Sequence, residues 1–240
     1  MRTELSLSPA LYPYRTITSS HAAVAIDLLR ATTAICAAFQ AGCSEVVPLD
    51  SLEALASYRR QGYLIAAERN GSKVGVPDGH VSSLAAEYGN SPTEYLRSDL
   101  HGVRLAYSTT NGTVAILRAA DADLTLVGAF ANLTALCDRL CRENRDTVIL
   151  CSGWKSDFCL EDTLVAGAVI ERCQADPVGD AARMALHLWR QAQHDPLAFC
   201  AEASHVHRLC NLGAEADVRF AFCLDTCPVV PVMKEGRLTL

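Results

Sequence analysis

The chain has 240 residues, half of them hydrophobic, and carries 21 basic against 27 acidic side chains, a net charge of −6. A chain of this length can bury one sizeable core. Its negative charge gives it no general attraction for nucleic acid or an anionic membrane surface, so we expect neither as a partner. No segment is apolar for long enough to cross a bilayer and the first residues lack a signal core, so we expect a cytoplasmic location.

Short apolar runs alternate with helix-forming segments through the first two thirds of the chain. The apolar runs predict strands at residues 22–28, 46–49, 63–67, 103–107, 124–127 and 147–151. Helices are predicted at residues 31–41, 113–120, 132–143 and 161–173, and another begins at 51–54 with Ser51 as its cap. Fully apolar strands separated by helices indicate an α/β fold, with a mainly parallel sheet flanked by helices.

The remainder of the chain is expected to be mostly helical, with helices at 181–193 and 196–212. A last strand is predicted at 228–233, at a sheet edge because of its two prolines. We expect a single domain over residues 1–240. If it divides into two lobes, residues 1–176 form the sheet-containing core and 177–240 a mostly helical tail packed on it. The Gly- and Ser-rich stretch 69–89 is long for a connection and indicates a functional loop.

The first predicted strand ends in charged residues, at the edge where open parallel sheets bind ligands. Asp27 is followed by Arg30 and by two threonines that start a helix. Asp27 could bind a divalent cation, and Arg30 with the helix N-terminus could hold an anionic oxygen. An Asp27–Arg30 ion pair with a threonine cap explains the same residues, and the sequence leaves both interpretations open.

A second acid–arginine pair, Glu68 and Arg69, follows the third strand. A solvated turn would explain one such pair alone. Two pairs at two strand ends favour a shared site for an anion and a cation, because the carboxyl ends of parallel strands meet at one edge.

Hydroxyl and amide groups follow the fourth strand, at Thr109, Thr110, Asn111, Gly112 and Thr113. Glycine allows backbone N–H groups to approach an oxyanion, and the hydroxyls add further donors. Because a helix cap needs one such residue and not five, we favour an anion-binding loop over a simple cap.

The segment before the fourth strand reads as a helix start. Ser91 is the predicted cap, Pro92 the first helical residue, and Glu94 completes a capping box. Asn90 remains available for a ligand.

Two adjacent carboxylates, Glu161 and Asp162, begin the helix after the sixth strand. The helix dipole stabilises acidic residues there, which explains them structurally. Metal binding is the alternative, since Mg²⁺ prefers hard oxygen ligands and uses one or two carboxylates.

Eleven cysteines without a Cys-x-x-Cys pair indicate buried reduced thiols in a cytosolic protein. A structural zinc site built from Cys223, Cys227 and either His205 or His207 is an alternative, although its spacing is not that of standard zinc ligands.

Several of these segments together resemble the 2-phosphosulfolactate phosphatase family over about residues 22–173. The motifs that carry the resemblance are Ile26-Asp27-Leu28-Leu29-Arg30-Ala31-Thr32-Thr33, Glu68-Arg69, Gly89-Asn90-Ser91-Pro92, Thr109-Thr110-Asn111-Gly112-Thr113 and Glu161-Asp162-Thr163-Leu164 followed by Ala166-Gly167. The tail, with Ser204, His205, Gly213, Asp217 and Asp225, is compatible. The chain departs from the family pattern at Ala34, at Ala67 and at Ser152-Gly153-Trp154-Lys155.

The resemblance implies a Mg²⁺-dependent phosphatase that converts 2-phosphosulfolactate to sulfolactate and inorganic phosphate, a step toward coenzyme M. The alternatives are the same chemistry on another small anionic phosphorylated hydroxy acid, and a binding protein for an anionic metabolite without catalysis.

These considerations assign the residues of one site. The metal ligands are expected among Asp27, Glu68, Glu161 and Asp162. The catalytic residues are expected to be Asp27, Arg30, Glu68 and Asn111. The substrate-binding residues are expected to be Arg30, Arg69, Asn90, Ser91, Thr109, Thr110, Asn111, Gly112 and Thr113. The expected cofactor is Mg²⁺, the expected partner a small organophosphate, and base rates favour a homodimer.

Overall fold

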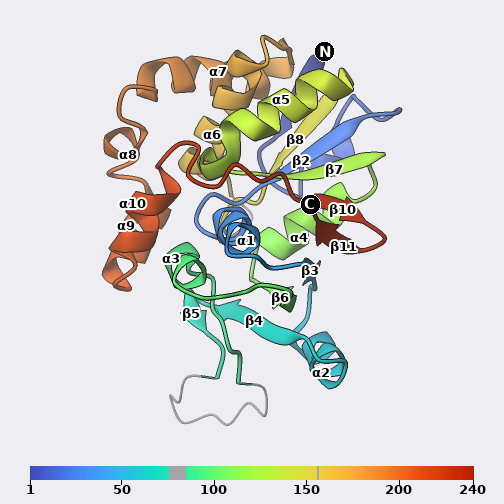
Figure 1. Ribbon diagram of the computed structural model, residues 1–240. Helices are drawn as coiled ribbons and strands as arrows, with labels where there is room; N and C mark the ends of the chain where they lie inside the picture. Colours follow the sequence, from blue (N-terminus) through green and yellow to red (C-terminus); the bar gives the residue numbers. More distant parts are fainter. Residues whose placement is uncertain (76–84, 156) are drawn as a thin grey trace.

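The computed structural model describes residues 1–75, 85–155 and 157–240. In these ranges eleven strands form one mixed, mainly parallel sheet in the order β5-β4-β6-β3-β11-β10-β7-β2-β8-β1-β9 (Figure 1). The strands are β1 (Arg2–Ser6), β2 (Ala22–Ile26), β3 (Glu45–Pro48), β4 (Leu64–Arg69), β5 (Ser72–Lys73), β6 (Arg104–Ser108), β7 (Leu124–Gly128), β8 (Thr147–Cys151), β9 (Asp176–Val178), β10 (Val232–Lys234) and β11 (Arg237–Thr239).

Helices flank this sheet, which confirms the predicted α/β class. They are α1 (Ala31–Gln40), α2 (Leu52–Arg60), α3 (Pro92–Leu96), α4 (Gly112–Ala119), α5 (Leu133–Glu143), α6 (Leu160–Arg172), α7 (Gly179–Ala192), α8 (Pro196–Phe199), α9 (Ser204–Asn211) and α10 (Glu215–Ala221), with short 3₁₀ turns at Tyr12–Tyr14 and Phe130–Asn132. Residues 76–84 of the predicted functional loop lie outside the described residues.

The central strands follow directly from their composition. All residues of β2 and β8 are buried, and β2 pairs in parallel with both β7 and β8. Strands covered on both faces require continuous apolar runs, which is the pattern that predicted them. Helix ends follow local chemistry as well, since the hydroxyl of Ser51 accepts from the Ala54 N–H and that of Ser91 from the Glu94 N–H. Gly42 stops α1 with a φ of +97°.

The C-terminal segment differs from its prediction in two ways. The helix expected at 196–212 is two helices, α8 and α9. The strand expected at an edge is a hairpin, β10–β11, in the middle of the sheet, antiparallel to β7 on one side and β3 on the other. The edge prediction was wrong because Pro228 and Pro231 precede β10, so neither proline interrupts its hydrogen bonding.

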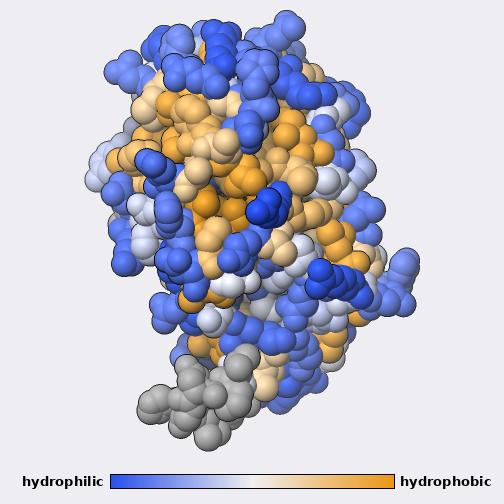
Figure 2. Space-filling model, turned by 90° about the vertical axis from the view of Figure 1, so that its left-hand side faces the viewer, coloured by the Kyte–Doolittle hydropathy of each residue, from blue (hydrophilic) through white to orange (hydrophobic). Residues whose placement is uncertain are grey.

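The C-terminal helices form one side of the molecule, on the left in Figure 1. Large hydrophobic side chains are exposed on or just after these helices, among them Met184, Phe199 and Leu212. Figure 2 views this side and shows hydrophobic surface gathered in its upper and middle part. The expected homodimer remains a prediction. Among the described residues, none of the helices combines the length and the hydropathy needed to cross a membrane.

Candidate active site

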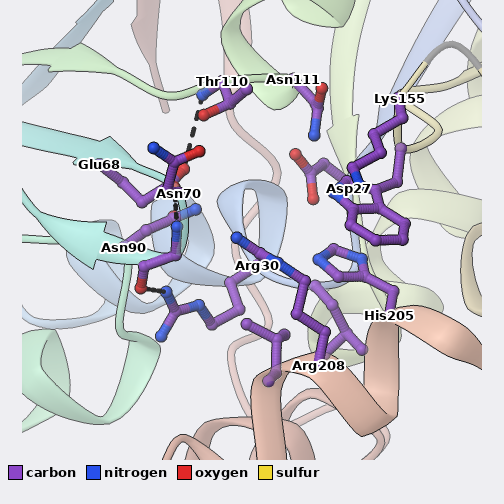
Figure 3. Close-up of a pocket in the computed structure, with 14 residues that line it drawn as sticks. Asp27, Arg30, Glu68, Asn70, Asn90, Thr110, Asn111, Lys155, His205 and Arg208 are labelled. Carbon is purple, nitrogen blue, oxygen red and sulfur yellow. Dashed lines mark hydrogen bonds between the residues drawn. The ribbon is translucent and has the colours of Figure 1, made fainter. Parts of the chain in front are cut away.

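A cavity of about 380 Å³ lies at the carboxyl ends of β2, β4 and β6. Figure 3 shows Asp27 on one side of it, Glu68 and Asn70 on the other, and Thr110 and Asn111 between them. Its other polar lining residues are Arg30, Asn90, Trp154, Lys155, His205 and Arg208. The strand-end clusters of β2, β4 and β6 therefore converge on one cavity, as the parallel topology requires.

Asp27 sits where α4 begins, and Gly112 makes this approach possible. A Cβ atom on residue 112 would lie 2.5 Å from Asp27 Oδ2 and nearer still to the Ala31 Cβ. Glycine is therefore required by space at this position, and its role differs from the anion contact expected of it.

The Asp27 carboxyl group is 6% exposed, and its burial raises its pKa from an ordinary value of 3.8 to about 7. The negative charges of Glu68 and Glu161 raise this pKa further, while the Ala31 backbone N–H and the charge of Arg30 lower it. Three acidic side chains are thus close enough to influence one another around a buried position. The buried Asp27 carboxylate is therefore stabilised when it binds a proton or a cation.

Glu68 and Arg69 have different surroundings. The Glu68 carboxylate lines the cavity and accepts from the backbone N–H groups of Gly71 and, at 3.5 Å, Thr110. Arg69 does not line the cavity. Its guanidinium donates to the Glu68 carbonyl oxygen at 2.6 Å and to the Ser108 hydroxyl at 2.9 Å, which ties the ends of β4 and β6 together.

Arg30 forms an ion pair, and its partner is Asp217 on α10. The Arg30 guanidinium donates to Asp217 Oδ2 at 2.9 Å and to the Gly71 carbonyl at 2.7 Å. Asp217 also accepts from the hydroxyls of Ser91 and Thr93, both at 2.7 Å. Ser91 is thereby directed to Asp217, and it does not line the cavity.

The loop after β6 combines the two roles considered for it. Thr109 and Thr113 bond each other, each hydroxyl accepting from the other's backbone N–H at 3.2 Å. Thr110 and Asn111 line the cavity. Asn90 lines it as well, and its side-chain oxygen accepts from the Tyr107 hydroxyl. The loop is capped by one pair of residues and presents another pair to a ligand.

Asp162 is buried, and both of its carboxylate oxygens are occupied. They accept from the Leu28 N–H at 2.8 Å, the Ser152 hydroxyl at 3.2 Å and the Gly153 N–H at 3.3 Å. Burial and the neighbouring negative charges of Asp27 and Glu161 raise the pKa of Asp162 well above its ordinary value. Asp162 holds the backbone that follows β2 and β8 in place.

Glu161 has one oxygen without a partner. Its Oε1 lies 3.1 Å from His205 Nδ1, while Oε2 is buried and has no hydrogen bond to any described residue. Cys159, Glu161 and His205 place their ligand atoms within 4.8 Å of one another. Cys223 and Cys227 do not belong to this cluster, so the described residues do not assemble the zinc site considered from the sequence.

Gly112→Ala is expected to lower the free energy of unfolding by about 1–3 kcal/mol, because the added methyl group overpacks the contact with Ala31 and Asp27. Turnover should fall by about tenfold or more, since Asp27 must move. Adding Ala31→Gly should restore part of the stability and little of the turnover, because the contact with Asp27 remains. Urea unfolding measures the first effect and an assay of the expected phosphatase activity measures the second; an unchanged stability would contradict the close packing.

Sequence reasoning did not assign Asn70, Trp154, Lys155 or Arg208 to the site, although all four line the cavity. Trp154 and Lys155 could have been noticed, because they belong to a segment after β8 that departs from the family pattern. Nothing in the sequence distinguishes Arg208, because an arginine on an amphipathic helix is common.

An α/β sheet whose strand ends bring buried carboxylates, a hydroxyl-rich loop and arginines to one cavity defines a site for a small anionic ligand. The family model described as 2-phosphosulpholactate phosphatase matches residues 7–236. The chain is 36% identical over 218 residues to a probable 2-phosphosulfolactate phosphatase of Thermotoga petrophila, covering 91% of each chain. It is 38% identical over 226 residues to one of Synechococcus sp. (strain CC9605), covering 89% of each. The chain belongs to the 2-phosphosulfolactate phosphatase family, named for a phosphoric monoester hydrolase, and the sequence resemblance is confirmed.

Proposed function

We propose that this protein hydrolyses the phosphate monoester of 2-phosphosulfolactate, in a Mg²⁺-dependent reaction that gives sulfolactate and inorganic phosphate. The observation that carries the proposal is the buried Asp27, whose pKa is about 7, facing the Thr110–Asn111 loop in a cavity that also holds arginine. The names of the relatives favour this ester as the substrate. Another phosphorylated hydroxy acid remains the second candidate. A cytoplasmic location and a homodimer are further parts of the proposal.

The carboxylates around the cavity fit a hard cation. We assign Mg²⁺ to Asp27 and Glu68, whose carboxylates line the cavity. Glu161 does not line it: its charge raises the pKa of Asp27, while its own close neighbours are Cys159 and His205. Asp162 supports the site through the backbone, since its oxygens already accept three hydrogen bonds. Bound Mg²⁺ would neutralise charge that develops on the transferring phosphoryl group.

The remaining cavity residues bind and orient the ester. Thr110 and Asn111 line the cavity at the N-terminus of α4 and would donate hydrogen bonds to phosphoryl oxygens. Arg30 contributes positive charge from a position fixed by Asp217 and the Gly71 carbonyl. The attacking oxygen belongs either to a water held in the cavity or to the Asp27 carboxylate.

Phosphate release from a panel of small phosphomonoesters tests this function. With Mg²⁺ present, release should be fastest from 2-phosphosulfolactate, and EDTA should abolish it. A preference for another ester would retain the chemistry and replace the substrate. Binding of these esters without any release of phosphate, with or without Mg²⁺, would refute the enzyme and favour the binding protein.

A further inference from the structure

The cations that line the cavity differ in whether a carboxylate already pairs with them. Arg30 is paired with Asp217 at 2.9 Å. Lys155 and Arg208 also line the cavity, and neither forms an ion pair with any residue that the structure describes. In a chain of net charge −6, two unpaired cations at one cavity wall constitute a local site for negative charge.

Trp154 organises these two cations. The Lys155 Nζ lies 4.5 Å from the centre of the Trp154 ring, and the Arg208 guanidinium carbon lies 5.5 Å from it. The ring is stacked on His205, with centroids 5.5 Å apart and planes 1° from parallel. A cation over an indole ring is attracted to it and loses conformational freedom, so less entropy is lost when an anion binds.

Arg208 is also positioned by packing. It extends from α9 toward the cavity (Figure 3). A Cβ atom on Gly71 would lie 2.6 Å from Leu212 Cδ1 and 3.2 Å from a guanidinium nitrogen of Arg208, so both side chains pack against this glycine. The Gly71 carbonyl accepts from Arg30. Arg30, which is paired, and Arg208, which is not, therefore both contact Gly71.

We propose that Arg208 and Lys155, held by Trp154, form the subsite for the substrate's second anionic group, the sulfonate or carboxylate that is not transferred. The inference rests on the proposed function and deepens it. The Thr110–Asn111 loop takes the phosphate beside the carboxylates that would hold the cation, while Trp154, Lys155 and Arg208 select esters that carry additional negative charge. Arg208 supplies a planar fork that matches two oxygens of such a group, and Lys155 supplies a point charge.

The kinetic test uses three phosphate esters, namely 2-phosphosulfolactate, 2-phospholactate without the sulfonate, and ethyl phosphate without either extra anion. Arg208→Gln is expected to lower kcat/KM for 2-phosphosulfolactate by about tenfold or more, mainly through KM, and for ethyl phosphate by less than about twofold. A loss on 2-phospholactate as large as on 2-phosphosulfolactate assigns the subsite to the carboxylate, and a smaller loss assigns it to the sulfonate. An equal loss on all three esters, or no loss on any, would overturn the proposal.

Two further variants keep the kinetic test selective. Lys155→Asn should show the same selectivity more weakly. Lys155 has a φ of +54°, a conformation that asparagine tolerates, so the charge is removed without straining the turn. Arg219→Gln is the control, because it removes a positive charge from an exposed position on α10 outside the cavity. It should leave kcat/KM unchanged for all three esters.

A binding measurement separates this inference from the proposed function. Sulfolactate should change the fluorescence of Trp154 in a saturable way, Trp154→Phe should remove that response, and Arg208→Gln should weaken binding by about tenfold. This result without phosphate release from any ester would uphold the subsite and refute the phosphatase. Sulfolactate binding that is equally tight in Arg208→Gln would overturn the subsite, whatever the turnover.

Discussion

Asp27→Asn is expected to reduce phosphate release by about a hundredfold or more, and to raise the stability of the metal-free protein near pH 8. The two effects have one origin. The carboxyl group is buried beside Glu68 and Glu161, so its ionised form is unfavourable in the folded protein unless a cation is present. Asparagine keeps the shape of the side chain and removes the charge on which the proposed site depends.

The pH dependence of this stability effect has a definite sign. Asp27 titrates near 3.8 in an unfolded chain and at about 7 in the folded protein. Between these values the folded protein holds a proton that the unfolded chain has released, so stability falls as pH rises through this window. The penalty is complete above pH 7 and corresponds to at most about 4 kcal/mol, because each pKa unit is about 1.4 kcal/mol.

Thermal unfolding in EDTA, near pH 5 and near pH 8, measures the effect. The Tm of Asp27→Asn should exceed that of the wild type by more near pH 8 than near pH 5. Added Mg²⁺ should reduce this difference in Tm, because it stabilises the wild type alone. Asp138→Asn, at an exposed position on α5, is the matched control and should change neither Tm nor turnover. Near-normal turnover of Asp27→Asn would refute the role of Asp27, and a gain independent of pH would refute the burial penalty.

Local sequence patterns predicted the parts of the fold that depend on neighbours in the chain. The strand at Thr147–Cys151 and the caps at Ser51 and Ser91 follow from apolar runs and side-chain hydrogen bonds within a few residues. The strand-end clusters at Asp27, Glu68 and Thr110 follow from one further rule, that parallel strands bring their carboxyl ends together.

Contacts between distant residues could not be predicted in this way. Arg30 and Asp217 are 187 residues apart, and no spacing in the sequence relates them. The β10–β11 hairpin joins β7 and β3, a pairing set by the assembled sheet and not by the prolines before it. Arg69 and Asp162 were assigned to a ligand from their residue types, whereas folding supplies Ser108 and the Leu28 N–H as their partners.

Asp217→Ala is expected to lower the free energy of unfolding by about 3–5 kcal/mol, because it leaves the buried guanidinium of Arg30 without its carboxylate. The two side chains are 8% and 7% exposed, so solvent cannot replace the lost partner. The hydroxyls of Ser91 and Thr93 lose their acceptor in the same variant. Phosphate release should also fall, because Arg30 lines the cavity and its hydrogen bond to Asp217 fixes its position.

Urea unfolding of a variant without either charge distinguishes the ion pair from general packing. Arg30→Met with Asp217→Leu should be more stable than Asp217→Ala alone, since it removes both buried charges, yet it should not recover turnover. Asp180→Ala breaks an exposed pair with Arg183 at 3.9 Å and should change stability by less than about 0.5 kcal/mol. A loss for Asp217→Ala as small as for Asp180→Ala would show that Arg30 does not depend on Asp217. The C-terminal helices would then cover the site without organising it.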